Sequence, residues 1–308
     1  MITRKVLMMN TPFTAYGQTI DDASDNFHRG HYDVPHPHGT LHLGTTTCVM
    51  GILNVTPDSF YDGKRYDTRE EAVEQALKMV KDGAAIIDVG GESTRPGAFA
   101  VSEEEEIKRV IPVIKLLSKQ IRTPISVDTC KAKVAERAID AGASMINDVG
   151  GLQADEKMAQ VAAGSRVPVI IMHKKGTPLT MQKNPIRKNA CVEIMAFLRK
   201  SISLVTEAGI EKNKIILDPG IGFGKTAQQN LEILKRLREF TCLGFPLMVG
   251  TSRKKFIGAV LDLPVQERLY GTLATLAVAV MNGAHIVRVH DVREAVQVVT
   301  LCDAIRNS

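Results

Sequence analysis

The strongest constraint on the fold of this chain is a short apolar run that recurs seven times, each time ending on a polar residue and followed by a turn or a helix. An eighth segment, PLMVGTSRKKF, brings Lys254 just past its apolar stretch. The seven runs end at Asn54, Asp88, Asp128, Asn147, His173, Asp218 and His290. Because a parallel β/α barrel gathers its active site at the C-terminal ends of its strands, the repeat predicts a fold and a site together.

Strand-like and helical patterns alternate from about residue 43 onward. The strand-like runs lie near 47–53, 84–89, 124–127, 144–147, 167–172, 214–218, 245–249 and 285–289. Several of the helical patterns between them end at a glycine that suits a left-handed C-cap, namely Gly83, Gly142, Gly164, Gly209 and Gly283. Eight such units fit a single closed (β/α)8 barrel of about 250 residues. The alternative, an open doubly wound sheet, would gather its polar strand ends at one switch point, whereas here they occur in all eight units.

Residues 1–40 are polar, contain proline and show no period. We therefore expect a flexible leader at 1–40, followed by one barrel domain at 41–308. Five histidines lie in or just after the leader, with Asp33 among them: His28, His31, His36, His38 and His42. Their spacing matches no metal-ligand pattern.

The composition indicates a globular enzyme. The chain has 308 residues, of which 44% are hydrophobic, and no apolar run approaches the roughly 18 residues of a membrane helix. Its five cysteines show no metal spacing, which favours reduced thiols and a cytoplasmic protein. The net charge of +5 is compatible with an anionic small substrate and too small to indicate nucleic-acid binding.

Two glycine-rich loops follow strand-like runs. In DVGGESTRPG, residues 88–97, accessible backbone amides with Thr94 and Arg95 suit a phosphate, and the alternative is a turn with a solvated arginine. In DPGIGFGKT, residues 218–226, the end superficially resembles a phosphate loop, but the required spacing would put a glycine where Pro219 stands. Asp218 can instead accept two hydrogen bonds from the N–C–N edge of a heterocycle.

The remaining strand ends carry polar groups that fit a planar heterocycle and an anion. Asp128 and Asn147 can bind the donor and acceptor edges of a ring, and the carboxylate can stabilise a cation, although either residue alone would more often cap a helix. Arg288 and His290 point to one side of their strand, so with Asn54 they form a plausible anion site. His173 is expected only to support a loop.

The ordered motifs MGILNVTPDSF, DVGGESTRPGA, SVDT, MINDVGG, LDPGIGFGK, SRKKFIG and VRVHDV resemble those of dihydropteroate synthases over about residues 47–305. The resemblance implies condensation of a pterin pyrophosphate with p-aminobenzoate during folate synthesis, through loss of Mg-pyrophosphate and attack of the arylamine on a pterin cation. It also implies a homodimer and competitive inhibition by sulfonamides.

The resemblance further implies a role for each matching residue. The pterin would be held by Asp128, Asn147, Met172, Asp218 and Lys254, with Asp88 as a loop anchor or an edge contact. Asn54, Arg288 and His290 would hold pyrophosphate, with Mg2+ on Asn54. Thr94, Arg95 and Pro96 would close over the site and, with Phe223 and Lys254, shape the p-aminobenzoate pocket. The catalytic residues would be Asp128, Lys254 and Arg95.

Two positions depart from the family pattern. After DSF the chain reads YDGKRY, where relatives usually have a serine- and glycine-rich loop, and Lys255 stands where many have a small hydroxyl residue. We expect Lys255, or the helix end beside it, to contact the p-aminobenzoate carboxylate. The alternatives for the whole chain are a pterin-dependent methyltransferase of similar fold and a catalytically silent pterin-binding protein.

Overall fold

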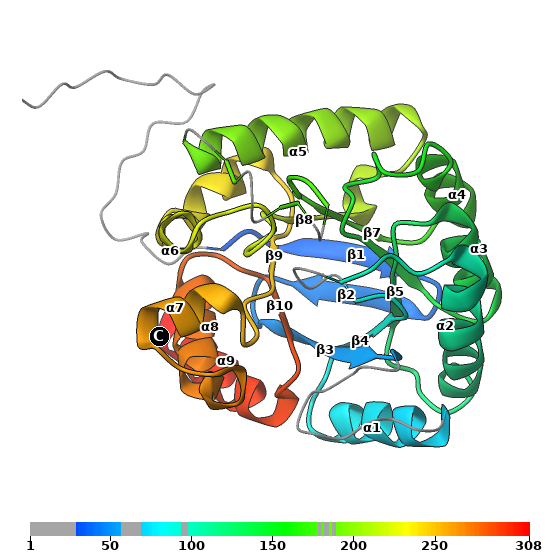
Figure 1. The fold of residues 1–308 in the computed structure, drawn as a ribbon, viewed down its shortest axis with the longest axis horizontal. Helices are drawn as coiled ribbons and strands as arrows, with labels where there is room; N and C mark the ends of the chain where they lie inside the picture. The colour runs from blue at the N-terminus through cyan, green and yellow to red at the C-terminus, as the bar shows by residue number, and fades with distance from the viewer. Residues whose placement is uncertain (1–28, 57–68, 94–97, 178–179, 182–184, 187–188) are drawn as a thin grey trace, which may run out of the picture.

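The computed structural model describes residues 29–56, 69–93, 98–177, 180–181, 185–186 and 189–308. At its centre, eight parallel strands lie in the order β8-β7-β6-β5-β4-β3-β10-β9. Their bounds are β3 (Cys48–Asn54), β4 (Ile86–Gly90), β5 (Ile125–Asp128), β6 (Met145–Asp148), β7 (Val169–Met172), β8 (Ile215–Asp218), β9 (Met248–Val249) and β10 (Ile286–Val289). A parallel bridge from Leu217 to Leu247 joins the two edge strands. The predicted (β/α)8 barrel is therefore confirmed (Figure 1).

Helices surround the strands (Figure 1). They are α1 (Arg69–Lys81), α2 (Glu103–Leu117), α3 (Ala132–Asp140), α4 (Met158–Ser165), α5 (Ala190–Glu207), α6 (Ala227–Lys235), α7 (Lys255–Leu261), α8 (Leu269–Met281) and α9 (Val292–Arg306), with 3-10 turns η1 (Lys212–Lys214), η2 (Leu237–Leu243) and η3 (Val265–Glu267). The predicted C-cap at Gly164 is wrong, because α4 continues past it to Ser165 and the left-handed C-cap residue is Arg166, whose φ is 55°.

The strands are buried on both faces, which explains their nearly continuous apolar sequence. One set of side chains packs outward against the helices. The alternate set fills the barrel interior, and every strand except β5 contributes to it: Met50, Ile86, Met145, Ile170, Ile216, Met248 and Ile286. Because the interior is filled by side chains, it is a packed core and the polar strand ends are held on a rigid support.

A β-hairpin covers the N-terminal end of this core. It consists of β1 (Tyr32–His36) paired antiparallel with β2 (Gly39–Leu43), and its Val34, Leu41 and Leu43 pack against the interior side chains of the barrel. Residues 29–40 were expected to belong to a flexible leader, but in the structure they lead into and form part of this packed hairpin. The three apolar residues alternate with polar ones as a half-buried hairpin requires, but they are too few to stand out in such a polar stretch. The expectation for 1–28 lies outside the described residues.

Arg29 attaches this hairpin to the rest of the fold. Its side chain is fully buried, donating from Nε to the Gly44 carbonyl at 2.9 Å, from Nη1 to Thr47 Oγ1 at 2.7 Å and from Nη2 to Asp303 Oδ1 at 3.1 Å. Burial lowers the pKa of Arg29 to about 10, and the charge of Asp303 opposes that shift. Arg29 thereby links the chain before β1 to α9, 274 positions away.

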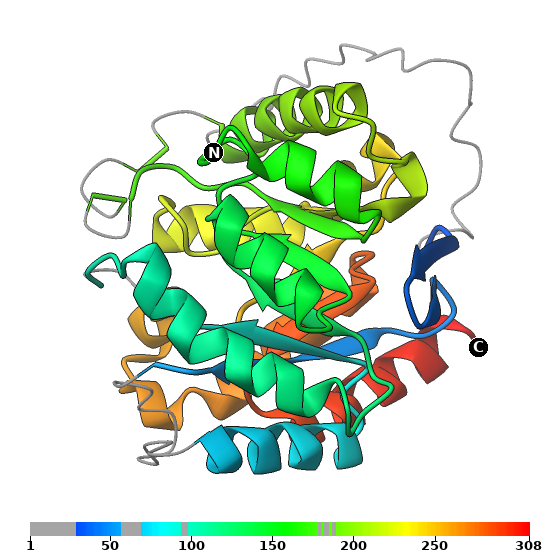
Figure 2. The same cartoon turned by 90° about the vertical axis from the view of Figure 1, so that its right-hand side faces the viewer.

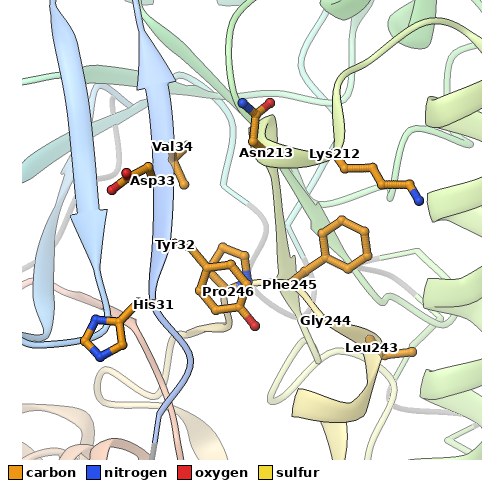
Figure 3. Close-up of a pocket in the computed structure, with 10 residues that line it drawn as sticks. All are labelled: His31, Tyr32, Asp33, Val34, Lys212, Asn213, Leu243, Gly244, Phe245 and Pro246. Carbon is orange, nitrogen blue, oxygen red and sulfur yellow. The ribbon is translucent and has the colours of Figure 1, made fainter. Parts of the chain in front are cut away.

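The two ends of the barrel differ. A cavity of about 430 Å³ lies at the hairpin end, between β1 and the segments around η1 and β9, and its lining includes Tyr32, Lys212, Asn213, Phe245 and Pro246 (Figure 3). In the side view the hairpin, in dark blue, lies at one end of the molecule beside the C-terminus (Figure 2).

Within the part of the chain that is described, no helix is long and apolar enough to cross a membrane.

Candidate active site

A cleft of about 640 Å³ opens at the C-terminal ends of the strands. Seven of the predicted site residues line it, and they come from β3, β5, β10 and the segments that follow β8 and β9: Asn54, Asp128, Phe223, Lys254, Lys255, Arg288 and His290. Residues separated by more than 200 positions in the sequence are therefore brought together, as the strand-end repeat predicted.

Arg288 connects two acidic strand ends at the base of the cleft. Its Nε donates to Asp88 Oδ2 at 2.6 Å and its Nη2 donates to Asp128 Oδ2, also at 2.6 Å. Burial disfavours the arginine's charge, but the two carboxylates hold the pKa of Arg288 above its usual value. Burial also raises the pKa of the Asp128 carboxyl, and Arg288 opposes that shift. One guanidinium thus serves two buried carboxylates.

Three buried oxygens beside this arginine have no hydrogen-bond partner among the described residues. They are Asp88 Oδ1, Asp128 Oδ1 and Asn147 Oδ1, on the neighbouring strands β4, β5 and β6. Leaving a buried acceptor without a donor costs about 1–3 kcal/mol, so such groups call for an explanation. A ligand that carries several N–H donors would satisfy those of Asp128 and Asn147.

Asp88 lies behind the cleft. It is fully buried, is not among the lining residues, and accepts hydrogen bonds on Oδ2 from Asn147 Nδ2 at 3.0 Å and from Arg288. These contacts hold the two residues that reach toward the site. The expected role as a loop anchor stays a prediction, because Thr94 and Arg95 lie outside the described residues.

Lys254 and Asp218 face each other across the loop that follows β8. The Lys254 ammonium donates to the Ile221 carbonyl and lies 4.7 Å from the centroid of the Phe223 ring, a cation–π geometry. Burial lowers the pKa of Lys254 to about 8, and Asp218 opposes the shift. Burial raises the pKa of Asp218, opposed chiefly by Lys254, and Asp218 Oδ1 accepts from the Gly220 amide at 2.6 Å.

His290 lies between two polar side chains on the opposite wall. Its Nδ1 is 2.8 Å from Ser252 Oγ, and its Nε2 is 3.4 Å from Asn54 Nδ2. Next to it, Arg253 forms a two-point ion pair with Asp291, at 2.8 and 3.1 Å. This wall is therefore rich in hydrogen-bond donors and positive charge, as an anion site requires.

The other predicted residues have different positions. Asn147, Met172 and Asp218 are almost fully buried at adjacent strand ends, beneath the cleft lining. His173 supports a loop, as expected, through a contact with Lys225. Thr94, Arg95, Pro96 and the YDGKRY segment lie outside the described residues.

Several lining residues were not predicted: Glu92, Met181, Asn230 and Arg268. Glu92 lies inside the glycine-rich motif DVGGESTRPG, so its position in that motif could have marked it as a site residue. The other three lie away from the strand ends in the sequence and reach the cleft only through the packing of the loops and helices around it.

Comparison with known proteins identifies the family. The pterin binding enzyme family model matches residues 50–290. A curated dihydropteroate synthase of Bacillus subtilis is 50% identical over 261 residues, covering 85% of this chain and 89% of that protein. The chain belongs to the dihydropteroate synthases.

Solved structures of dihydropteroate synthases agree with this assignment. The Yersinia pestis enzyme in a sulfonamide drug complex aligns with a TM-score of 0.86 and 43% identity, covering 90% of this chain and all of that one. The Xanthomonas albilineans enzyme with 4-aminobenzoic acid aligns with a TM-score of 0.81 and 41% identity, over 87% and 96%. Family membership makes the chain a transferase and disfavours the methyltransferase alternative.

The lowered pKa of Lys254 predicts a pH dependence for dihydropteroate synthase activity. The ammonium is lost as the pH rises through about 8, so kcat/KM should fall above that pH, approaching tenfold per pH unit. Lys254→Arg keeps its charge throughout and should lack this descending limb, whatever its absolute rate. Steady-state assays from pH 6 to 10 test this, and parallel profiles for the two proteins would contradict it.

Proposed function

We propose that this chain condenses 6-hydroxymethyl-7,8-dihydropterin pyrophosphate with p-aminobenzoate, forming 7,8-dihydropteroate and pyrophosphate. The observation that carries the proposal is the set of unpartnered buried oxygens on Asp128 and Asn147, in a member of the dihydropteroate synthases. A pterin ring presents several N–H donors along one edge, which complement such acceptors. The sulfonamide and 4-aminobenzoic acid complexes of the two solved relatives support an aminobenzoate pocket in the same cleft.

The ring would lie over the ends of β5 to β8. Asp128 and Asn147 accept from its N–H groups, Asp218 accepts from its amidine-like edge, and Met172 packs beside it. Lys254 donates to an acceptor on the ring, exchanging its present partner, the Ile221 carbonyl, for the ligand. Because Asp128, Asn147 and Asp218 are buried at strand ends, they are oriented before the substrate binds.

Pyrophosphate would be held by Asn54, Arg288 and His290, with Thr94, Arg95 and Pro96 closing over both substrates. The Nδ2 of Asn54 faces His290, which leaves Oδ1 as the oxygen suited to Mg2+. Among the described residues no group of three or more Asp, Glu, His or Cys side chains could hold a metal. Asn54 and the pyrophosphate oxygens would therefore bind Mg2+ together, as this ion commonly binds. When bound, Mg2+ neutralises charge on the leaving group.

In the reaction, the bond between the pterin methylene carbon and the pyrophosphate oxygen breaks, and the electron pair leaves with pyrophosphate. The positive charge that develops on the methylene and ring is stabilised by the Asp128 carboxylate, whose ionised form Arg288 favours against the effect of burial. The arylamine nitrogen then forms the new C–N bond and releases its proton to water. A neutral arylamine is already nucleophilic, so no dedicated general base is required.

Pyrophosphate release tests this mechanism. Wild type should release pyrophosphate from the pterin substrate slowly without p-aminobenzoate and faster with it. Asp128→Asn should reduce release by about 100-fold in both conditions, because an amide cannot neutralise the cation. Asp140→Asn, an exposed aspartate on α3, is the matched control and should behave as wild type. An absolute requirement for the amine would instead indicate direct displacement, and no release at all would indicate a silent pterin-binding protein.

We also propose that Lys255 contacts the carboxylate of p-aminobenzoate. Lys255 is exposed, begins α7 and lines the cleft. Lys255→Ala should raise the KM for p-aminobenzoate by up to about fivefold, the effect of an exposed ion pair, and leave the KM for the pterin substrate unchanged. Lys212→Ala, on η1 at the hairpin end, is the control. An unchanged KM for p-aminobenzoate would refute the contact.

A homodimer is proposed through α8 and α9, which pack side by side. Both helices expose large apolar side chains: Tyr270 and Val278 on α8, and Leu301 and Ile305 on α9. An apolar surface of this kind is typical of a protein interface. Light scattering should give twice the mass of one chain, and Val278→Glu should give the monomer mass. Val192→Glu, on exposed α5 at another side of the barrel (Figure 1), should remain dimeric. A monomeric wild type would contradict the proposal.

All five cysteines are free thiols. Reduced cysteines are usual in the cytoplasm, which is the compartment we propose.

A further inference from the structure

Lys225 has a buried ammonium group, although the residue is among those that line the cleft. It lies in the loop between β8 and α6, and only 2% of the residue is exposed. The Nζ atom lies 2.7 Å from the Gly220 carbonyl oxygen, 3.0 Å from that of Phe223 and 2.9 Å from His173 Nδ1. A fourth acceptor, the His173 carbonyl oxygen, is farther away at 3.4 Å. An ammonium has three N–H donors, so each of the three shorter contacts can take one.

His173 completes this arrangement from the neighbouring strand end. Because Lys225 donates to Nδ1, the imidazole is neutral and carries its hydrogen on Nε2; burial and the nearby lysine charge both lower the pKa of His173, to about 2. The ring packs edge-on against Phe197 with centroids 4.9 Å apart, and the His173 amide donates to the Asp218 carbonyl at 3.0 Å. The histidine is thus held on three sides.

The loop itself presses closely on this support. Gly220 has a φ of 70°, and a Cβ atom at that position would lie 1.9 Å from the His173 carbonyl oxygen. Only glycine permits this approach. The path of the loop after β8 is therefore determined by the end of β7.

Two lysines hold the loop from opposite sides. The carbonyls of Gly220 and Phe223 accept from buried Lys225, whereas the carbonyl of Ile221, between them, accepts from Lys254 in the cleft. The Phe223 ring lies against the Lys254 ammonium. Any shift of residues 220–223 would move both groups that face the substrates.

We propose that Lys225, oriented by His173, is a positioning residue for the condensation, because it fixes the backbone that places Phe223 and Lys254 against p-aminobenzoate and the pterin. This inference rests on the proposed function. An apolar side chain at 225 would avoid burying a charge, but it would leave the acceptors without donors. Burial lowers the pKa of Lys225 to about 7, and Asp218 opposes the shift, which is consistent with a lysine retained for its hydrogen bonds.

The main test compares Lys225→Met with Lys214→Met. The second variant is the control, because it makes the same lysine-to-methionine change at the other end of β8. There the Lys214 Nζ donates to exposed Glu211 at 2.7 Å. Lys225→Met should raise the KM for p-aminobenzoate about tenfold or more at a temperature well below its melting point, whereas Lys214→Met should leave it unchanged. A variant with a lower melting temperature and wild-type KM values would overturn the proposal. Inactive wild-type protein would refute the proposed function instead.

A second pair tests the same role without removing the lysine. Asn at position 173 places an amide oxygen near the position of Nδ1 and can accept from Lys225, whereas Leu cannot. We expect His173→Asn to keep the KM for p-aminobenzoate within about threefold of wild type, and His173→Leu to raise it about tenfold. Equal KM values for the two variants would overturn the proposal, and this comparison decides the matter if Lys225→Met does not fold.

Discussion

The ion pairs of Arg288 are the interaction on which the site depends. Two buried carboxylates on neighbouring strands would repel each other, and their charged forms would be disfavoured without a cation between them. The guanidinium satisfies one oxygen of Asp88 and one of Asp128, and within the described part of the chain the other oxygen of each has no hydrogen-bond partner. The fold therefore maintains a polar site whose hydrogen-bonding capacity is only partly used, and substrate recognition can draw on the remainder.

The rest of the site follows from that arrangement in layers. Strand ends fix the carboxylates and Asn147, while loops carry the groups that meet the reacting parts of the substrates. The loop after β8 accepts hydrogen bonds on its backbone from both Lys225 and Lys254. Such internal support lets a glycine-rich segment, flexible by composition, present Phe223 at a defined place.

The sequence predicts features that have a local pattern, and it does not predict features that depend on contacts between distant residues. The eight strands and the residues Asn54, Asp128, Arg288 and His290 were predictable, because each of these residues lies in an apolar run or at its end. The hairpin was not, since its burial depends on the barrel interior that it covers. The contacts of Asp88 and Lys225 were equally hidden, because a charged side chain carries no local sign of the partner that lets it be buried.

Arg29 has a practical consequence for engineering the protein. It joins the first described part of the chain to Thr47 and Asp303, at the barrel end that the hairpin covers. Shortened versions of the chain should therefore begin before Arg29 and retain β1 and β2, even though the family motifs start later. A fusion partner attached before Arg29 would join the barrel at the end away from the cleft, leaving the catalytic face accessible to substrates and inhibitors.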